Sequence, residues 1–415
     1  MVTANIDRKG ARIFVEGDLN ALNLHIFLAV LHRATEKAGY QDLTLDLSKC
    51  SAAFPGAMLA VCAQVTQLRE SGVYCSLQLP SDNRLRSLFL NANWAHLLDP
   101  RGHDPSRFKG YTRIPATQFK GPDQQQTAVN RIVGAILGAI PGMDRADFAA
   151  FEWAINELTD NVLTHSESQI GGLVQVSTFQ KNKKRVEFVV ADAGIGVPES
   201  LRKSYPDFSS DTEALDKAIR EGVTRDKSLG QGNGLFGSWQ ICSHSGGRFH
   251  VESGHARLVD TPMGGLHVYN ERIPYSGTVI VATIDFSNPK LLQEALRLGG
   301  VTHLPVDYIE THFEADLTED LIFRVTDESV SLGSRPAGMP VRQKLLNLSA
   351  MAAGRKIYVD FDDIALVSSS FADEVLGKLF AEFGPLEFMQ RFELRNMSPM
   401  VKQIVDRAMQ QRLKV

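Results

Sequence analysis

Residues 151–165, FEWAINELTDNVLTH, decide the fold of the central part of the chain. Apolar residues recur there at intervals of three and four, which predicts a helix with one core-facing side. Glu157, Asn161 and His165 stand at i, i+4 and i+8, so they form a polar stripe beside that side. An ordinary solvated helix would show the same stripe, so this segment alone leaves both interpretations open. The core-facing residues are Phe151, Ile155, Leu158 and Val162.

A glycine turn follows further along the chain. The segment VVADAGIGVP at 189–198 predicts a buried strand that delivers Asp192 to a turn containing Gly194 and Gly196. Glycine permits a positive φ and a close approach of the backbone to a ligand. A buried carboxylate at a strand end can accept a hydrogen bond from the exocyclic amine of a purine. An ordinary glycine turn is the alternative interpretation.

A second glycine-rich segment precedes an apolar helix. Gly230, Gly232 and Gly234 are spaced GxGxG and run directly into LFGSWQIC. A glycine loop at a helix N-terminus offers backbone N–H groups and the positive end of the helix dipole to a phosphate. The segment lacks the lysine of a P-loop and does not follow a first βα turn with GxGxxG, which excludes a Rossmann fingerprint.

Together and in this order, ELTDN, DAGIG and GQGNG resemble the N box and the two glycine boxes of the GHKL superfamily. That superfamily has the Bergerat ATP-binding fold and includes gyrase, mismatch-repair ATPases, histidine kinases and anti-sigma-factor serine kinases. GGRFHVESG at 246–254 and the strand that starts at Gly277 complete the pattern. The resemblance covers roughly residues 130–287, and it implies that ATP and Mg²⁺ are the cofactors.

The resemblance also implies a role for single residues. Asn161 would ligate the Mg²⁺ that bridges the phosphates, and Glu157 would orient or deprotonate the attacking water or hydroxyl. Asp192 would bind the adenine amine. Gly194 and Gly196 would let the ring approach, Gly230, Gly232 and Gly234 would wrap the triphosphate, and Thr278 would add a hydrogen bond near the base.

The blocks on either side of this centre alternate strands with helices. DLTLDLSKCSAAFPGAMLAVCAQV at 42–65 and KIYVDFDDIALVSSSFADEVLGKL at 356–379 show the same succession of strand, loop and helix, and a further strand and helix follow each. The pattern predicts an α/β protein (two-layer α+β throughout) in which one module type occurs twice. Two unrelated βαβα units are the alternative. The expected domains are 1–105, a linker at 106–126, the ATP-binding domain at 127–290, a connector at 291–318, and 319–415.

Both flanking blocks resemble STAS domains, the fold of anti-sigma-factor antagonists. In that family a phosphoaccepting serine opens a helix, and Ser369 and Ser370 occupy this place in the C-terminal block. An ordinary helix N-cap would place serines there equally well. Pro55 and Gly56 stand at the matching position of the first block, which predicts a docking module that is not phosphorylated.

Composition narrows the possible partners. The chain has 415 residues with 44 Lys+Arg and 48 Asp+Glu, a net charge of −4, so it has no basic excess for nucleic acid. The apolar run IVGAILGAIPGM at 132–143 is too short to span a bilayer. The polar start of the sequence lacks a signal-peptide core, so we expect a cytoplasmic protein. The four cysteines form no CxxC pair and predict reduced thiols.

Two functions from different classes remain open. In the first, the chain is a signalling protein with a serine-kinase-like ATPase centre that switches protein partners through its STAS-like modules. In the second, it is an ATP-gated conformational ATPase, a dimeric clamp of the gyrase or chaperone kind that phosphorylates no protein. A nucleotide-binding scaffold with negligible turnover is a third. The resemblance implies a protein partner and allows a homodimer.

Overall fold

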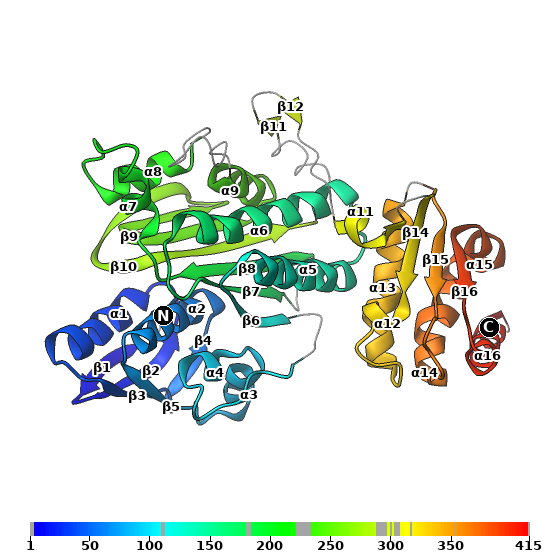
Figure 1. Cartoon of the computed structure of the whole chain (residues 1–415), viewed down its shortest axis with the longest axis horizontal. Coiled ribbons are helices and arrows are strands. Elements are labelled where there is room, and N and C mark those ends of the chain that lie inside the picture. The colour runs from blue at the N-terminus through cyan, green and yellow to red at the C-terminus, as the bar shows by residue number, and fades with distance from the viewer. Residues whose placement is uncertain are drawn as a thin grey trace. The chain divides into compact units, whose positions relative to one another are not determined.

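The computed structural model describes residues 4–108, 113–179, 184–220, 234–287, 297–298, 301–302, 308–315, 318–352 and 354–413 (Figure 1). The chain forms two compact units. The first comprises Met1–Val129, Trp153–Phe179 and Arg185–His303, and the second comprises Asn130–Glu152, Gln180–Lys184 and Leu304–Val415. The mixture of helices and open sheets confirms the predicted α/β class.

The N-terminal module of the first unit, residues 4–108, is a sheet with helices on it. Strand order is β1-β2-β3-β5, with β4 also paired to β2; β1 and β2 are antiparallel and the other pairs are parallel. Leu43 and Leu45 of β3 are buried while their neighbours are not, which is the alternation that the sequence predicted. The elements are β1 Asn5–Lys9, β2 Arg12–Leu19, α1 Leu24–His32, a π-helical turn Arg33–Lys37, β3 Asp42–Asp46, β4 Cys50–Ala53, α2 Pro55–Glu70, β5 Tyr74–Gln78, α3 Asn83–Asn91 and α4 Trp94–Leu98.

The central sheet has the antiparallel order β6-β7-β8-β10-β9. Its strands are β6 Arg113–Phe119, β7 Gly172–Thr178, β8 Arg185–Asp192, β9 Arg248–Thr261 and β10 Gly265–Asp285. Its helices are α5 Pro122–Ala139, α6 Arg145–His165, α7 Gly196–Arg202, α8 Asp211–Ala218 and α9 Gly234–His244. Helices α7, α8 and α9 contact β9 and β10, whereas α2 of the N-terminal module contacts β7, β8 and β10 (Figure 1).

The segment expected as a linker at 106–126 contains a strand. β6 pairs with β7, with Phe119 opposite Gly172. Ile114, Ala116 and Phe119 are buried. The polar and Gly/Pro-rich composition of this segment predicted a linker, because the strand buries only three apolar side chains against the sheet.

The second unit contains the C-terminal module. Strand order is β13-β14-β15-β16, with β13 and β14 antiparallel and the other pairs parallel. This order and these directions match those of β1-β2-β3-β5 in the N-terminal module, whose sheet has the additional strand β4. The elements are α11 Tyr308–Phe313, β13 Glu314–Ala315, β14 Thr318–Arg324, α12 Val325–Glu328, α13 Arg335–Met351, β15 Ile357–Asp360, α14 Ser369–Ala372, a π-helical turn Asp373–Gly377, α15 Lys378–Arg391, β16 Phe392–Arg395 and α16 Pro399–Leu413. The short β11 Arg297–Leu298 and β12 Val301–Thr302 belong to the first unit.

Helix α13 of this module holds the end of α5. The Asn347 side chain donates to the carbonyl oxygens of Leu137 and Ile140, both at 2.7 Å, and accepts from the N–H of Gly142. These carbonyls stand in the last turn of a helix, where no intrahelical donor remains. Nearby, Lys344 pairs with the buried carboxylate of Glu328 at 2.5 Å. The second unit therefore packs polar side chains of its C-terminal module against the tip of the α5–α6 hairpin.

Among the residues that the structure describes, every helix is too short or too polar to traverse a bilayer. All four cysteines are buried and unpaired, which confirms the prediction of free thiols.

Candidate functional site

Asp192 is the last residue of β8 and lies in the interior. The residue is 3% exposed, and its carboxylate accepts the N–H of Gly194 at 2.8 Å. Burial raises the pKa of Asp192 to about 7, while the backbone N–H groups of Gly194 and Thr278 oppose that rise. Ala191 and Ala193 belong to the apolar cluster that includes α2, so Asp192 points to the opposite face of the sheet. A strongly shifted, buried carboxylate at a strand end is a candidate functional group.

The turn after Asp192 packs directly against the end of α6. A Cβ added at Gly194 would stand 1.9 Å from the carbonyl oxygen of Ser166, and the N–H of Ile195 donates to the same oxygen at 2.8 Å. Only glycine fits there. Gly196 has φ +78° and begins α7. Both predicted glycines therefore shape this turn, and the turn abuts the helix that carries Glu157 and Asn161.

A pair of hydroxyls lies beside the turn. Thr278 stands opposite Ser253 in the β9–β10 register, and their hydroxyl oxygens are 3.0 Å apart. The Ser253 hydroxyl also donates to the Gly277 carbonyl and accepts the N–H of Val197, both at 2.8 Å. Thr278 was predicted as a site residue, whereas Ser253 was not. The only sequence signal for Ser253 was its position in the segment GGRFHVESG, which forms part of the family resemblance.

The polar stripe of α6 meets the first residue of α9. A Cβ at Gly234 would lie 2.5 Å from Glu157 Oε2 and 3.3 Å from the Asn161 side-chain nitrogen. Glu157 is partly buried, and burial together with the charge of Asp160 raises its pKa. The side chains of Glu157 and Asn161 therefore lie beside the first residue of this eleven-residue helix. Gly230 and Gly232 lie outside the described residues.

Asn161 and its surroundings fit a Mg²⁺ ion that is coordinated partly by the protein and partly by the nucleotide phosphates. Across the described ranges, no three His, Cys, Asp or Glu side chains gather as a metal site. Mg²⁺ in nucleotide sites is typically held by one or two protein oxygens together with phosphate oxygens and water. The Asn161 amide oxygen is a ligand of the right type for such an arrangement, and the Glu157 carboxylate lies beside the same residue of α9.

The serines of the C-terminal module divide into different environments. Ser368 Oγ accepts the N–H of Phe371 at 3.1 Å, so Ser368 is the N-cap of α14. Ser369 is exposed, and Ser370 is half-buried with its hydroxyl 3.1 Å from that of Ser368. The cap interpretation therefore applies to Ser368 and leaves the Ser369 hydroxyl at the surface.

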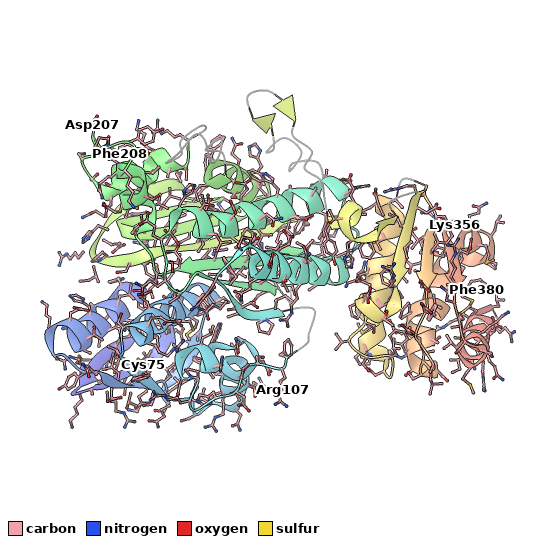
Figure 2. All side chains as sticks on the ribbon, viewed as in Figure 1. Cys75, Arg107, Asp207, Phe208, Lys356 and Phe380 are labelled. Carbon is pink, nitrogen blue, oxygen red and sulfur yellow. The ribbon has the colours of Figure 1, made fainter. Side chains whose placement is uncertain are left out.

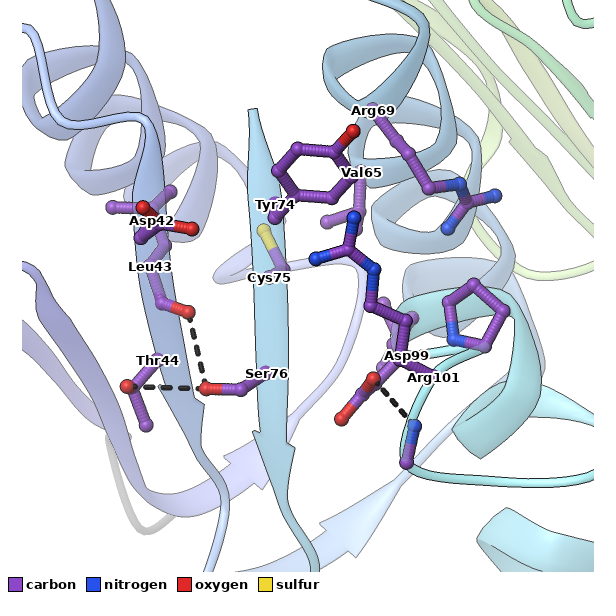
Figure 3. A pocket seen from close by; sticks show the side chains of 13 residues that line it. Asp42, Leu43, Thr44, Val65, Arg69, Tyr74, Cys75, Ser76, Asp99 and Arg101 are labelled. Carbon is purple, nitrogen blue, oxygen red and sulfur yellow. Dashed lines mark hydrogen bonds between the residues drawn. The ribbon is translucent and has the colours of Figure 1, made fainter. Parts of the chain in front are cut away.

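A separate cavity of about 430 Å³ lies in the N-terminal module, beside Cys75 (Figure 2, Figure 3). The Arg101 guanidinium stacks on the Tyr74 ring at 3.8 Å. Arg69 and Arg101 in its wall are matched by two aspartates, so the lining carries no net charge. None of the candidate site residues lines this cavity. The lining residues are Asp42, Leu43, Thr44, Val65, Arg69, Tyr74, Cys75, Ser76, Leu98, Asp99, Pro100, Arg101 and Gly102.

Two parts of the chain match known protein families. Residues 146–288 match the family of histidine kinase-, DNA gyrase B- and HSP90-like ATPases. Residues 337–402 match a STAS-like domain of unknown function (DUF4325). No curated protein matches the chain. The chain thus contains a GHKL-type ATP-binding domain followed by a C-terminal STAS-like domain.

Proposed function

We propose that the chain is a regulatory ATPase of the protein serine kinase type, which binds Mg·ATP between α6, α9 and the Asp192 turn. The observation that carries this proposal is the meeting of Gly234, Glu157 and Asn161 at the N-terminus of α9. A helix N-terminus attracts phosphate through its N–H groups and its dipole. An amide and a carboxylate beside it suit a metal-bound triphosphate and a nucleophile that must lose a proton.

Each residue has a distinct role in this proposal. Asp192 accepts a hydrogen bond from the adenine amine, and the hydroxyl of Thr278 lies beside it. Asn161 holds Mg²⁺, which when bound neutralises charge on the phosphates. Glu157 takes the proton of the attacking hydroxyl as the bond from that oxygen to the γ-phosphorus forms and the bond to ADP breaks. Gly234 lies beside the phosphates; the expected role of Gly230 and Gly232 in wrapping them falls on residues outside the described part of the chain.

The affinity for ATP should depend on pH through Asp192. The ionised carboxylate is a much stronger hydrogen-bond acceptor for the amine than the neutral acid. A pKa of about 7 means that roughly 90% of Asp192 is ionised at pH 8 and roughly 10% at pH 6. We expect the Kd for Mg·ATP to rise about tenfold between pH 8 and pH 6. Calorimetric titration with Mg·ATP at both pH values measures this change. An affinity that is equal at the two pH values contradicts the assignment of the adenine contact to Asp192.

We further propose that the flanking modules provide the protein contacts. Both have the matching strand order described above, and we propose that the N-terminal one is STAS-like as well. In the C-terminal module, Ser369 is the preferred phosphoacceptor because its hydroxyl is exposed, and Ser370 is the second candidate. The charge balance of the chain favours a protein partner over nucleic acid.

Incubation with γ-labelled Mg·ATP tests the kinase proposal. We expect label on Ser369, on Ser370 or on a co-purifying protein, and the variant Ser369→Ala should lose the label on the chain if Ser369 accepts it. Ser398→Ala is the matched control, because Ser398 also precedes a helix of this module. Steady release of phosphate without labelled protein would instead support the ATP-gated conformational ATPase. Binding without release or transfer would support a scaffold.

A further inference from the structure

Helix α2 of the N-terminal module is buried on two sides. Every residue from Gly56 to Ala63 is buried, and the helix shares one apolar cluster with β8 and β10. A Cβ at Gly56 would come within 2.6 Å of Val281 Cγ2 on β10, so the start of α2 lies directly on the central sheet. The α4 side chain of Trp94 adds a buried hydrogen bond to Gln175 of β7 at 2.8 Å. The N-terminal module is therefore packed onto the ATP-binding domain of the same chain.

The contact reaches an irregularity in β10. The pairing of β9 with β10 shifts register between Tyr275 and Thr278, a bulge of the kind that often re-aims side chains next to active sites. The Ser276 carbonyl in this bulge accepts a hydrogen bond from Gln64 Nε2 of α2 at 2.6 Å. The N-terminal module thus satisfies a backbone group that the bulge turns away from the ladder.

The same bulge encloses the backbone of Asp192. The Tyr275 hydroxyl, fully buried, donates to the Asp192 carbonyl at 3.0 Å. Gly277 has φ +101°, and a Cβ there would stand 2.4 Å from the Asp192 carbonyl and 2.7 Å from its Oδ1. Movement of this bulge therefore moves the carboxylate, because no free space separates the two backbones.

From this chain of contacts we infer that Gln64 is a positioning residue for adenine recognition: α2 of the N-terminal module holds the 275–278 bulge, and the bulge holds Asp192. The inference rests on the proposed function, since it assigns a use to the ATP site. The packing of α2 on the sheet also bears on Gly56, which stands where a phosphoacceptor serine was expected. A Cβ at Gly56 would meet the Val281 side chain, so a serine at Gly56 would have no room.

The test uses the full chain and isosteric substitutions. Gln64→Met keeps the length of the side chain and removes the N–H donor, so we expect the Kd for Mg·ATP to rise about three- to tenfold. Gln64→Lys restores a donor of similar reach and should bring the Kd back to within about twofold of wild type. Gln67→Met is the matched control. Gln67 lies one turn further along α2 and contacts the side chain of Gln169 instead of the bulge.

Tyr275→Phe supplies a second measurement at the other end of the contact chain. We expect this substitution to raise the Kd for Mg·ATP to a similar extent. In the double variant with Gln64→Met, the loss of binding free energy should be smaller than the sum of the two single losses, because both residues act through one bulge. Equal Kd values for wild type, Gln64→Met and Gln67→Met overturn the inference and leave the proposed function standing. A wild-type protein that binds no ATP overturns both.

Discussion

Replacing Asp192 by asparagine will abolish the rise in melting temperature that Mg·ATP produces in the wild-type protein. A ligand at 100 times its Kd stabilises the native state by about 2.7 kcal/mol, which corresponds to roughly 3 °C in melting temperature for a chain of 415 residues. The Asp192 carboxylate already receives the N–H groups of Gly194 and Thr278. An asparagine must turn its carbonyl oxygen to those donors, and its NH₂ group then faces the amine of adenine. Two opposed donors should weaken binding about 100-fold or more.

The same variant should make the ligand-free protein more stable at pH 8. The folded pKa of Asp192 is about 7, above its unfolded value of about 3.9, so the folded state binds the proton more tightly. The free energy of unfolding of the wild type therefore falls as pH rises from about 4 to about 7. A neutral asparagine undergoes no such fall, so the variant should be more stable than the wild type at pH 8, by at most about 4 kcal/mol. The difference should shrink towards pH 4. Melting curves with and without Mg·ATP at several pH values measure both effects, and a variant that binds ATP normally contradicts the site.

Replacing Glu157 by glutamine will lower phosphate release or phosphoryl transfer by about 10²–10⁴-fold while the Kd for Mg·ATP stays within about twofold. Glutamine preserves the shape beside Gly234 but cannot take a proton. Burial, with the charge of Asp160, raises the pKa of Glu157 towards the range in which a carboxylate is an effective base. Single-turnover kinetics with labelled ATP separate the chemical step from binding.

Asp160→Asn is the matched control for this prediction. Asp160 is exposed, lies on the same helix, and raises the pKa of Glu157 through its charge alone. Its neutralisation should lower the pKa of Glu157, so the acid limb of the pH–rate profile should move to lower pH without a large loss of maximal rate. A Glu157→Gln enzyme with wild-type turnover would remove Glu157 from the chemistry.

Much of the candidate site could be predicted because its motifs are local. The α6 stripe follows from helical periodicity, and the Asp192 turn follows from a β-strand that ends in two glycines. The α/β class and the repeated module follow from the alternation of elements. These features depend on residues close together in the chain, for which spacing is sufficient evidence.

Other features depend on partners far away in the chain. Ser253 becomes part of the site only because the register of β9 and β10 places it opposite Thr278. β6 is a strand only because β7 is there to pair with it. The polarity of a side chain does not specify which distant residue it will contact. The pairing of Ser253 with Thr278 and the formation of β6 could therefore not be predicted from sequence patterns.

By itself, then, the sequence determined which local structures carry Glu157, Asn161 and Asp192 and which glycines allow close approach. The tertiary structure alone decided that α2 covers the sheet behind Asp192 and that Asn347 closes the end of α5. The physical reason is that the apolar composition of α2 predicts that the helix is buried without specifying which surface covers it. Contacts such as that from Gln64 to Ser276, 212 positions apart, exist only after the apolar faces have packed.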